Sequence, residues 1–288
     1  SAFLPADFEY YSDMSEKSMN IIKKFADVFE YVGRDEAYLD VSEKAELDFT
    51  KASHIAQQIK NEVREKTKLT CSVGISPNKL LSKIASNYKK PDGLTTITPD
   101  KISEFMETLN LEDIHGVGKK TVQKLAEEGI ETISQAKNLD IFVLISMFGR
   151  KTGTYIHNAV RGINDEVVKI RAPTLQLSKI MTLKEDSVDY TFLEKNLFEL
   201  CEKLYSSIIN ENKMFRSVGI YLTQTDLSSK TKSKMLRNST LSLNELKKVS
   251  GQLLKEALMD QSILIRRLGV KVSELSDLEG QSNITSYF

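Results

Sequence analysis

The chain has 288 residues, of which 40% are hydrophobic and 28% are charged, a composition typical of soluble globular proteins. Its 40 basic and 40 acidic residues give a formal net charge of zero, so any nucleic-acid surface has to come from local segregation of charge. Because Cys71 and Cys201 lie far apart and no Cys/His spacing is typical of zinc, we expect a reduced, intracellular protein. We expect neither a membrane span nor a signal peptide.

The first 98 residues alternate between helix and strand patterns and are predicted to form one α+β unit. A helical pattern starts near residue 14, with Ser12 or Asp13 as its candidate N-cap. The elements predicted after it are strands at 27–32 and 37–41, a helix at 51–66, a strand at 69–76 and a helix at 78–90.

Residues 99–170 change character and read as short helices separated by glycine-containing turns, which predicts an all-helical domain. A short linker is predicted at residues 171–175. Residues 176–275 return to mixed structure, and their order of strand, helix, strand, strand, helix, strand is typical of a four-stranded sheet with two helices on one face. The elements predicted there are a strand at 176–183, a helix at 192–209, strands at 216–225 and 230–240, a helix at 243–259 and a strand at 264–272.

The dipeptide Asp35-Glu36 follows Gly33, which is expected to turn the chain between two strands. Side chains of adjacent residues in a regular strand face opposite ways, but a turn allows both carboxylates to converge. Converging carboxylates repel each other unless a divalent cation lies between them, and oxygen ligands favour Mg²⁺. The alternative is a solvated acidic turn.

The segment from Ile114 to Thr121 contains His115-Gly116-Val117-Gly118 followed by Lys119 and Lys120, the pattern of a helix-hairpin-helix. The exposed amides at the start of the next helix suit a DNA phosphate, and the two lysines add attraction that depends on salt. Such a contact positions the backbone and reads no sequence. An ordinary helical turn is the alternative.

Two further segments are basic. Lysines at both ends of the predicted helix 78–90, including Lys83 and Lys90, could bind phosphate as point charges, although a solvated helix explains them as well. Residues 213–240 hold six basic residues and one acidic residue, a charge of +5. That excess favours a sheet face that follows a duplex backbone over a merely solvated strand.

The last residues combine Gln281, Ile284, Tyr287 and Phe288 in a short polar tail. The three apolar side chains could lie on one side of a single helical turn and fill a hydrophobic pocket on a partner protein. A disordered end that happens to be aromatic is the alternative.

In this order, the motifs resemble those of the Y-family translesion DNA polymerases, specifically the polymerase IV branch. The resemblance covers nearly the whole chain and is carried by residues 35–44, 73–86, 89–93, 115–125 and 265–273. It implies an α+β multidomain fold with a partial palm at 1–98, an all-helical thumb with a helix-hairpin-helix at 99–170, a linker at 171–175, a four-stranded little finger with two helices on one face at 176–275, and a clamp-binding tail at 276–288.

By position, the resemblance implies that Asp35 and Glu36 are catalytic metal ligands for two Mg²⁺ ions and that Lys90 and Lys83 bind the nucleotide. The implied DNA-binding residues are Gly116, Gly118, Lys119, Lys120, Lys232, Lys234, Arg237, Arg266 and Arg267. The tail residues Gln281, Ile284, Tyr287 and Phe288 are similar to the peptide that docks on sliding clamps of the PCNA type.

Two departures from the family pattern bear on activity. The family's first palm strand, with its metal-ligating Asp, and its fingers domain have no counterpart in this sequence. Gly33-Arg34 also stands where the family has a Ser and an apolar residue. Arg34 could lower metal occupancy, alter the geometry, or partly replace a missing charge. We therefore expect the 288-residue chain alone to be inactive.

The resemblance implies a DNA-directed DNA polymerase, a nucleotidyltransferase of damage bypass. Its expected partners are primer–template DNA, a dNTP and the clamp; we expect a monomer in the cytoplasm with the nucleoid, or in the nucleus of a eukaryote. The alternative is a non-catalytic, clamp-tethered DNA-binding accessory protein. A helix-hairpin-helix nuclease or glycosylase would need a clear catalytic Lys or His near the hairpin, which the sequence does not offer.

Overall fold

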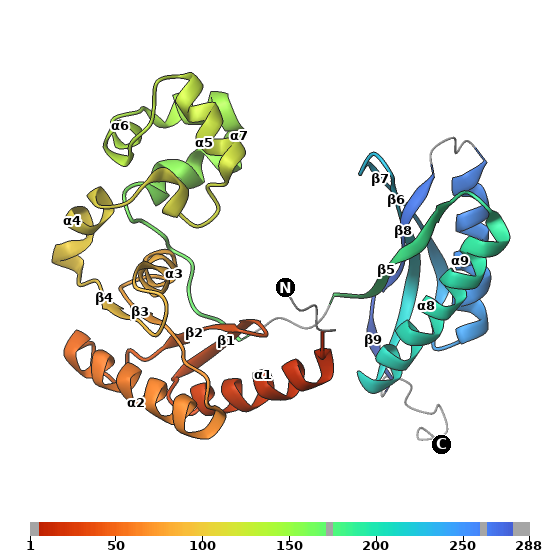
Figure 1. Ribbon diagram of the computed structural model, residues 1–288, viewed down its shortest axis with the longest axis horizontal. Coiled ribbons are helices and arrows are strands. Elements are labelled where there is room, and N and C mark those ends of the chain that lie inside the picture. Colours follow the sequence, from red (N-terminus) through yellow and green to blue (C-terminus); the bar gives the residue numbers. More distant parts are fainter. Residues whose placement is uncertain (1–5, 171–174, 260–263, 279–288) are drawn as a thin grey trace, which may run out of the picture. The chain divides into compact units, whose positions relative to one another are not determined.

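The computed structural model describes residues 6–170, 175–259 and 264–278 and separates into two compact units, Ser1–Arg171 and Ala172–Phe288 (Figure 1). Each unit has a hydrophobic core of its own. Across these described ranges, no helix combines the length and apolar character that crossing a membrane requires.

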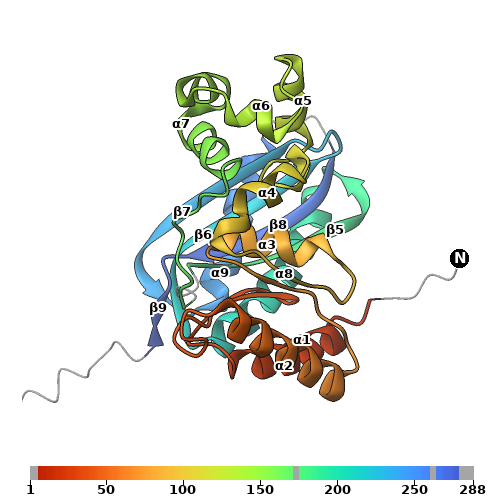
Figure 2. The same ribbon diagram turned by 90° about the vertical axis from the view of Figure 1, so that its left-hand side faces the viewer.

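The first part of unit 1 is a hairpin sheet covered by two helices. Strands β1 (Val28–Gly33) and β2 (Glu36–Asp40) pair antiparallel, and helices α1 (Phe8–Lys23) and α2 (Phe49–Thr67) lie side by side next to them (Figure 2). Ile21, Ile59 and Val63 of the helices form a small core with Leu39 of the sheet. Burial of these apolar faces is what holds the hairpin in place.

Helix α1 begins earlier than the sequence predicts. Its N-cap is Asp7, whose carboxylate accepts a hydrogen bond from the Tyr10 amide, so the expected cap at Ser12 or Asp13 is wrong. The first turns expose Phe8, Tyr10 and Tyr11 and therefore lack the apolar periodicity that marks a buried helix face.

A second, parallel pair of short strands carries helix α3. The elements are β3 (Val73–Ile75), α3 (Lys79–Tyr88) and β4 (Leu94–Thr96), and β3 pairs with β4. Strand β4 was not predicted, because three residues are too few to show a period and their pairing with β3 is non-local. Gly74 allows β3 to lie against α3, since a Cβ there would be 2.1 Å from the Ser82 carbonyl oxygen.

The remainder of unit 1 is helical, as predicted. Its elements are the 3₁₀ turns Pro99–Lys101 and Leu111–Asp113 and helices α4 (Ile102–Glu107), α5 (Lys119–Glu127), α6 (Ile133–Lys137) and α7 (Ile141–Ala159). One core runs from Leu81 and Ile84 of α3 to Leu125 of α5 and Ile156 of α7. Helix α3 is thus packed on the helical part as well as on its own strands.

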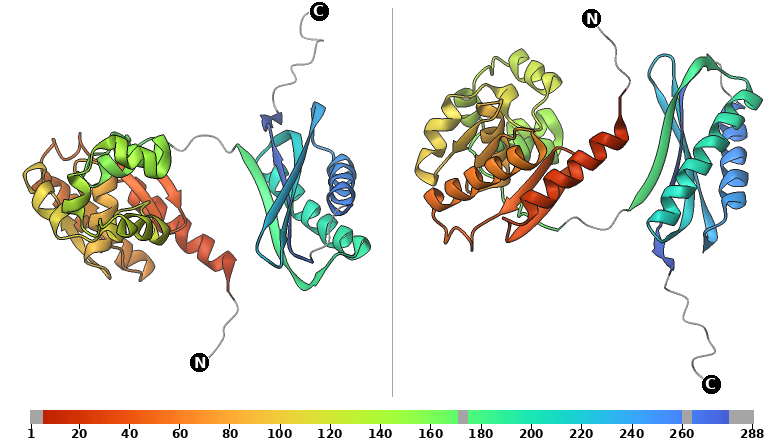
Figure 3. Two further views of the ribbon diagram at one scale, coloured as in Figure 1. Left: turned by 90° about the horizontal axis from the view of Figure 1, so that it is seen from above. Right: turned by 60° about the horizontal axis from the view of Figure 1, so that its bottom comes forward.

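Unit 2 is an antiparallel sheet in the order β5-β8-β6-β7 with two helices on one face (Figure 3). The strands are β5 (Gln176–Ser187), β6 (Lys213–Gln224), β7 (Ser229–Thr240) and β8 (Ile265–Ser273), and the helices are α8 (Tyr190–Asn210) and α9 (Leu243–Leu258). A two-residue strand β9 (Ser276–Asp277) pairs with β6, which adds a fifth strand to the four predicted. Its residues lie in the predicted polar tail, where no alternation marks so short a strand.

Candidate active site and DNA-binding surfaces

The β1–β2 hairpin places Asp35 and Glu36 in different surroundings. Gly33 and Glu36 face each other across the turn, Asp35 is exposed within it, and Glu36 begins β2 half-buried. The Nζ atom of Lys83 forms an ion pair with Oε1 of Glu36. The predicted metal ligand Glu36 and the predicted nucleotide ligand Lys83 are therefore in direct contact.

Helix α3 meets strand β2 through two lysines one helical turn apart. Lys83 contacts Glu36, and the Nζ atom of Lys79 lies 4.8 Å from the ring centroid of Tyr38, two residues along the strand. Residues two apart in a strand share a face, and residues four apart in a helix share a face, so the two contacts are in register. This docking holds the carboxylate hairpin against α3.

Lys79 is a buried lysine at the centre of an ion cluster that sequence reasoning did not assign. Its Nζ donates to Oε1 and Oε2 of Glu30 at 2.9 and 3.0 Å and lies 3.0 Å from Oε1 of Glu166, and its side chain is only 8% exposed. Glu30 also accepts a hydrogen bond from the amide of Lys169 at 3.0 Å. The cluster ties the segment after α7 to the hairpin.

Burial and hydrogen bonding have opposite effects on the pKa values of Glu30 and Lys79. Burial disfavours both charges, but the mutual hydrogen bonds outweigh it, so the pKa of Glu30 is lowered and that of Lys79 is raised. Burial, and then the carboxylates of Glu36 and Glu166, raise the pKa of Tyr38 to about 12. Tyr38 therefore remains a neutral phenol beside the carboxylate hairpin.

Lys90 follows α3 and is exposed, in a loop that a buried lysine of α2 anchors. Lys60 donates to the carbonyl oxygens of Cys71 and Asp92 at 2.7 and 2.8 Å and pairs with the Asp92 carboxylate, whose pKa this hydrogen bond lowers. Sequence reasoning missed Lys60; its position beside Ile59 on the apolar side of α2 was the available signal.

The helix-hairpin-helix has the geometry that its glycines predict. Gly116 has a φ of +86°, a left-handed conformation that favours glycine, and Gly118 is the N-cap of α5 without a capping side chain. The Tyr155 hydroxyl of α7 donates to the carbonyl oxygen of His115 and holds the turn. Lys119 and Lys120 are exposed in the first turn of α5, where a phosphate can approach.

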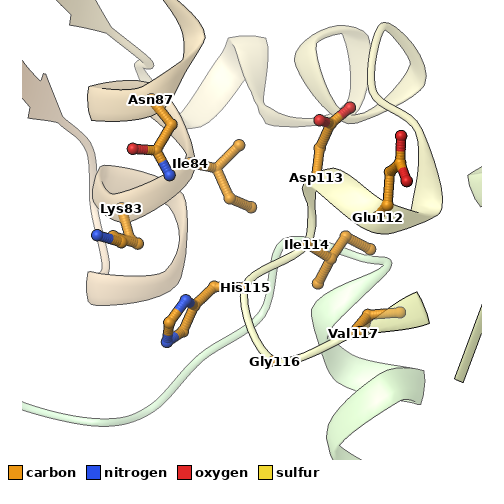
Figure 4. A pocket seen from close by; sticks show the side chains of 10 residues that line it. Lys83, Ile84, Asn87, Glu112, Asp113, Ile114, His115, Gly116 and Val117 are labelled. Atoms are coloured by element: carbon orange, nitrogen blue, oxygen red, sulfur yellow. The ribbon is translucent and has the colours of Figure 1, made fainter. Parts of the chain in front are cut away.

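A cavity of about 380 Å³ joins α3 to this hairpin. Lys83, Ile84 and Asn87 line it from α3, and residues 112–118 line it from the thumb side. Figure 4 shows Lys83 on the α3 side of the cavity and the carboxylates of Glu112 and Asp113 across from it on the thumb side. Lys83 thus borders both the carboxylate hairpin and the helix-hairpin-helix.

In unit 2, strand register divides the predicted DNA-binding residues between the two faces of the sheet. Lys232 and Lys234 pair in register with the buried Ile220 and Val218, and they contact α9 through the Glu256 carbonyl oxygen at 3.1 Å and Oε1 of Gln252 at 3.3 Å. They therefore lie on the helix-bearing side, although both remain exposed.

The opposite, open face carries other basic residues. Arg267 pairs with Thr182 and Thr223 there, and the Nζ atom of Lys271 lies 5.1 Å from the ring centroid of Tyr221. Sequence reasoning did not name Lys271. Arg266 is exposed at a register shift of β8, and Arg237 is exposed on the edge strand β7.

The predicted clamp-binding residues, Gln281, Ile284, Tyr287 and Phe288, lie outside the described residues, as do residues 171–174 of the predicted linker.

Comparison with known proteins agrees with these features. The family model described as the impB/mucB/samB family matches residues 1–87, and the model of its C-terminal domain matches 175–285. A model described as the DNA polymerase-iota thumb domain matches residues 112–164. DNA polymerase IV of Nitrosopumilus maritimus is 62% identical over 288 residues, which is all of this chain and 79% of that protein. The chain belongs to the Y-family DNA polymerases, in the polymerase IV branch.

Other polymerases of the branch are more distant in sequence but share the fold. DNA polymerase IV 1 of Methanosarcina mazei is 36% identical over all of this chain and 80% of its own length. A chimera of the Y-family polymerases Dbh and Dpo4 superposes with a TM-score of 0.87 at 28% identity, over 95% of this chain and 78% of the other. An insertion ternary complex of Dbh polymerase gives a TM-score of 0.66. The predicted α+β fold with a helix-hairpin-helix thumb is confirmed.

Y-family polymerases use divalent metal ions. Asp35 and Glu36 supply hard carboxylate oxygens, which suit a cation that completes its shell with water and phosphate oxygens. The described residues contain no group of three or more His, Cys, Asp or Glu side chains that could hold a metal alone. The donor set fits such a cation as a partial site.

Proposed function

We propose that this polymerase transfers nucleotides from dNTPs to a primer on a DNA template, in damage bypass. The observation that carries the proposal is the position of α3. One helix contacts the carboxylate hairpin through Lys83 and Glu36, and it borders the helix-hairpin-helix through the shared cavity. The proposed metal ligands and the proposed backbone-binding turn therefore both lie next to α3.

In the proposed reaction, the primer 3′-hydroxyl loses its proton to solvent and its oxygen bonds to the α-phosphorus of the dNTP. The bond between that phosphorus and the oxygen bridging to the β-phosphate breaks, and pyrophosphate leaves. Asp35 and Glu36 would hold Mg²⁺, which supplies Lewis-acid stabilisation of the developing charge. Lys90, exposed on the loop anchored by Lys60, would contact the triphosphate. Gly116, Gly118, Lys119 and Lys120 would hold one strand of the duplex by its phosphates.

The proposal is tested by Mn²⁺ binding and primer extension in wild type and Glu36→Gln. We expect Glu36→Gln to abolish Mn²⁺ binding by paramagnetic resonance, while its primer–template affinity stays close to that of wild type measured with Mn²⁺. Extension should be measured with the 288-residue chain and with the product of the complete open reading frame; in an active protein the substitution should cost roughly 100-fold or more.

Two results would contradict parts of this proposal. The alternative of a non-catalytic accessory protein would be favoured by two findings together. The chain would bind DNA without either carboxylate, and the product of the complete open reading frame would show no primer extension. Robust extension by the 288-residue chain with Mg²⁺ would overturn the expectation that this chain alone is inactive.

We also propose that the protein is a monomer in the cytoplasm or nucleus and is tethered to a sliding clamp of the PCNA type by residues 281–288. The support is the Gln, aliphatic and two aromatic residues of that segment. Deleting residues 281–288 should abolish clamp binding by calorimetry without changing DNA affinity, and unchanged clamp binding would refute the tether.

A further inference from the structure

Lys83 has two possible partners in the palm and thumb. Its Nζ atom pairs with Oε1 of Glu36, and the Lys83 side chain is 17% exposed against 33% for Glu36. The same side chain lines the cavity that α3 shares with the helix-hairpin-helix. A lysine at this boundary can reach a carboxylate on one side and an anion on the other.

Glu36 cannot serve Lys83 and a divalent cation equally well. Like charges a few ångströms apart repel each other. A cation on Glu36 would therefore weaken the contact with Lys83. The four-carbon stem of lysine is flexible, so its ammonium group can leave without moving the helix.

The cavity next to Lys83 offers the released ammonium group a place beside a DNA phosphate. Its thumb side carries Gly116 and Gly118 of the hairpin. The acidic groups there do not favour a phosphate, but Asp113 already accepts a hydrogen bond from the Asn110 amide at 2.8 Å, and Glu112 lies with it on the side opposite Lys83. The basic side of the cavity is the Lys83 side.

We propose that Lys83 is an exchangeable counter-ion. Without a divalent cation it neutralises Glu36; when a cation binds Glu36, Lys83 is released to a DNA phosphate in the cavity. Metal and DNA then bind with positive coupling, because each removes a competitor of the other, and the coupling is reciprocal by thermodynamic linkage. This inference rests on the proposed function in so far as Glu36 is a metal ligand.

The first experiment measures Mn²⁺ affinity of the 288-residue chain without DNA, by paramagnetic resonance. Lys83→Gln removes the competing charge and keeps a polar side chain. We expect it to bind Mn²⁺ about three- to tenfold more tightly than wild type, the size expected for loss of a partly exposed ion pair and its repulsion. Lys83→Arg, which retains the charge, should resemble wild type.

The matched control is Lys66→Gln, which removes a lysine from the ion pair with Glu62 on α2. It should leave Mn²⁺ affinity unchanged, because it lies on another element. A folding defect would not tighten metal binding, so the sign of the Lys83→Gln effect separates the proposed role from a structural one.

The second experiment measures primer–template affinity by fluorescence anisotropy, with and without Mn²⁺ at constant ionic strength. Wild type and Lys66→Gln should bind DNA about three- to tenfold more tightly with Mn²⁺, and by linkage DNA should tighten their Mn²⁺ binding by the same factor. Lys83→Gln should show no gain with Mn²⁺, because it has no cation to release.

The outcomes separate this inference from the proposed function. If Glu36→Gln abolishes Mn²⁺ binding but Lys83→Gln leaves the metal affinity and the metal-dependent DNA affinity at wild-type values, the exchange is refuted and the metal site stands. If Glu36→Gln leaves Mn²⁺ binding intact, Glu36 is not a metal ligand and both proposals fail. Weaker Mn²⁺ binding by Lys83→Gln would also overturn the exchange.

Discussion

At the scale of single residues, four lysines of unit 1 differ in burial and in their partners, although the sequence does not distinguish them. Lys60 and Lys79 are buried and bind carbonyl or carboxylate oxygens of the protein itself. Lys83 is paired with Glu36, and Lys90 is exposed. Lys90 is exposed and not held by burial, which makes it a simpler candidate for the triphosphate than Lys60 or Lys79.

The Lys79 cluster gives a stability prediction. Lys79→Met would leave Glu30 buried without its cation, and breaking a buried pair on one side costs about 3 to 5 kcal/mol. We expect that loss in the free energy of unfolding of unit 1, measured with urea. Lys17→Met, which removes the exposed pair with Asp13, should cost less than about 1 kcal/mol. Equal losses in both variants would contradict the assigned role.

The same cluster predicts a dependence of stability on pH. Because the pKa of Glu30 is lowered from 4.5 in the folded protein, its stabilisation is fully present above that value and is lost as the pH falls through the folded pKa. The free energy of unfolding should therefore fall less steeply between pH 7 and pH 3 for Glu30→Gln than for wild type. Parallel curves would show that Glu30 is not linked to folding.

At the scale of elements, α3 is the part that organises unit 1. It lies on β3 at Gly74, on β2 through Tyr38 and Glu36, and on the helical part through a common core. Rigid packing on several sides is what fixes the positions of its side chains. The contact with β3 is close enough to be sensitive to one methyl group.

Gly74→Ala tests that contact. The added Cβ would be 2.1 Å from the Ser82 carbonyl oxygen and 2.4 Å from the Ser86 amide nitrogen, so α3 or β3 has to shift. We expect a loss of about 1 to 3 kcal/mol in stability, the usual cost of overpacking. Gly251→Ala in α9 is the control, because its nearest neighbour is the end of the Glu194 side chain at 3.3 Å, and it should be neutral or slightly stabilising. If Gly74→Ala left the stability unchanged, the contact between α3 and β3 would be looser than these distances indicate.

At the scale of the whole molecule, the polymerase has two units, each with its own core. The core of unit 2 is centred on residues such as Phe215, Leu197 and Val270, and that of unit 1 on residues such as Leu125 and Ile156. Units with separate cores can lose stability independently.

Phe215→Ala should therefore destabilise unit 2 alone. Phe215 is fully buried, and truncating such a ring costs about 3 to 5 kcal/mol. Hydrogen exchange measured by mass spectrometry should accelerate in peptides from β6 and β8 and stay unchanged in α5 and α7. Leu125→Ala should give the reverse pattern. Acceleration throughout the chain in either variant would mean that the units unfold together.

Element type was predictable where one side of an element is buried over several turns or strand residues. Helices α2, α8 and α9 and strand β6 have such a buried side, and the structure places them within a few residues of the predicted bounds. Strands β4 and β9 were missed because they hold three and two residues and exist only through pairing with distant strands. A short strand of this kind has no local signal.

The sequence by itself determined the family, because several motifs occur in a fixed order, and it located Asp35, Glu36 and the glycines of the hairpin. Only the tertiary structure decided that Lys83 contacts Glu36, that Lys79 is buried with Glu30, and that Lys232 and Lys234 lie toward α9. The reason is physical: a motif is local in sequence, whereas an ion pair or a choice of sheet face is set by packing between elements far apart along the chain.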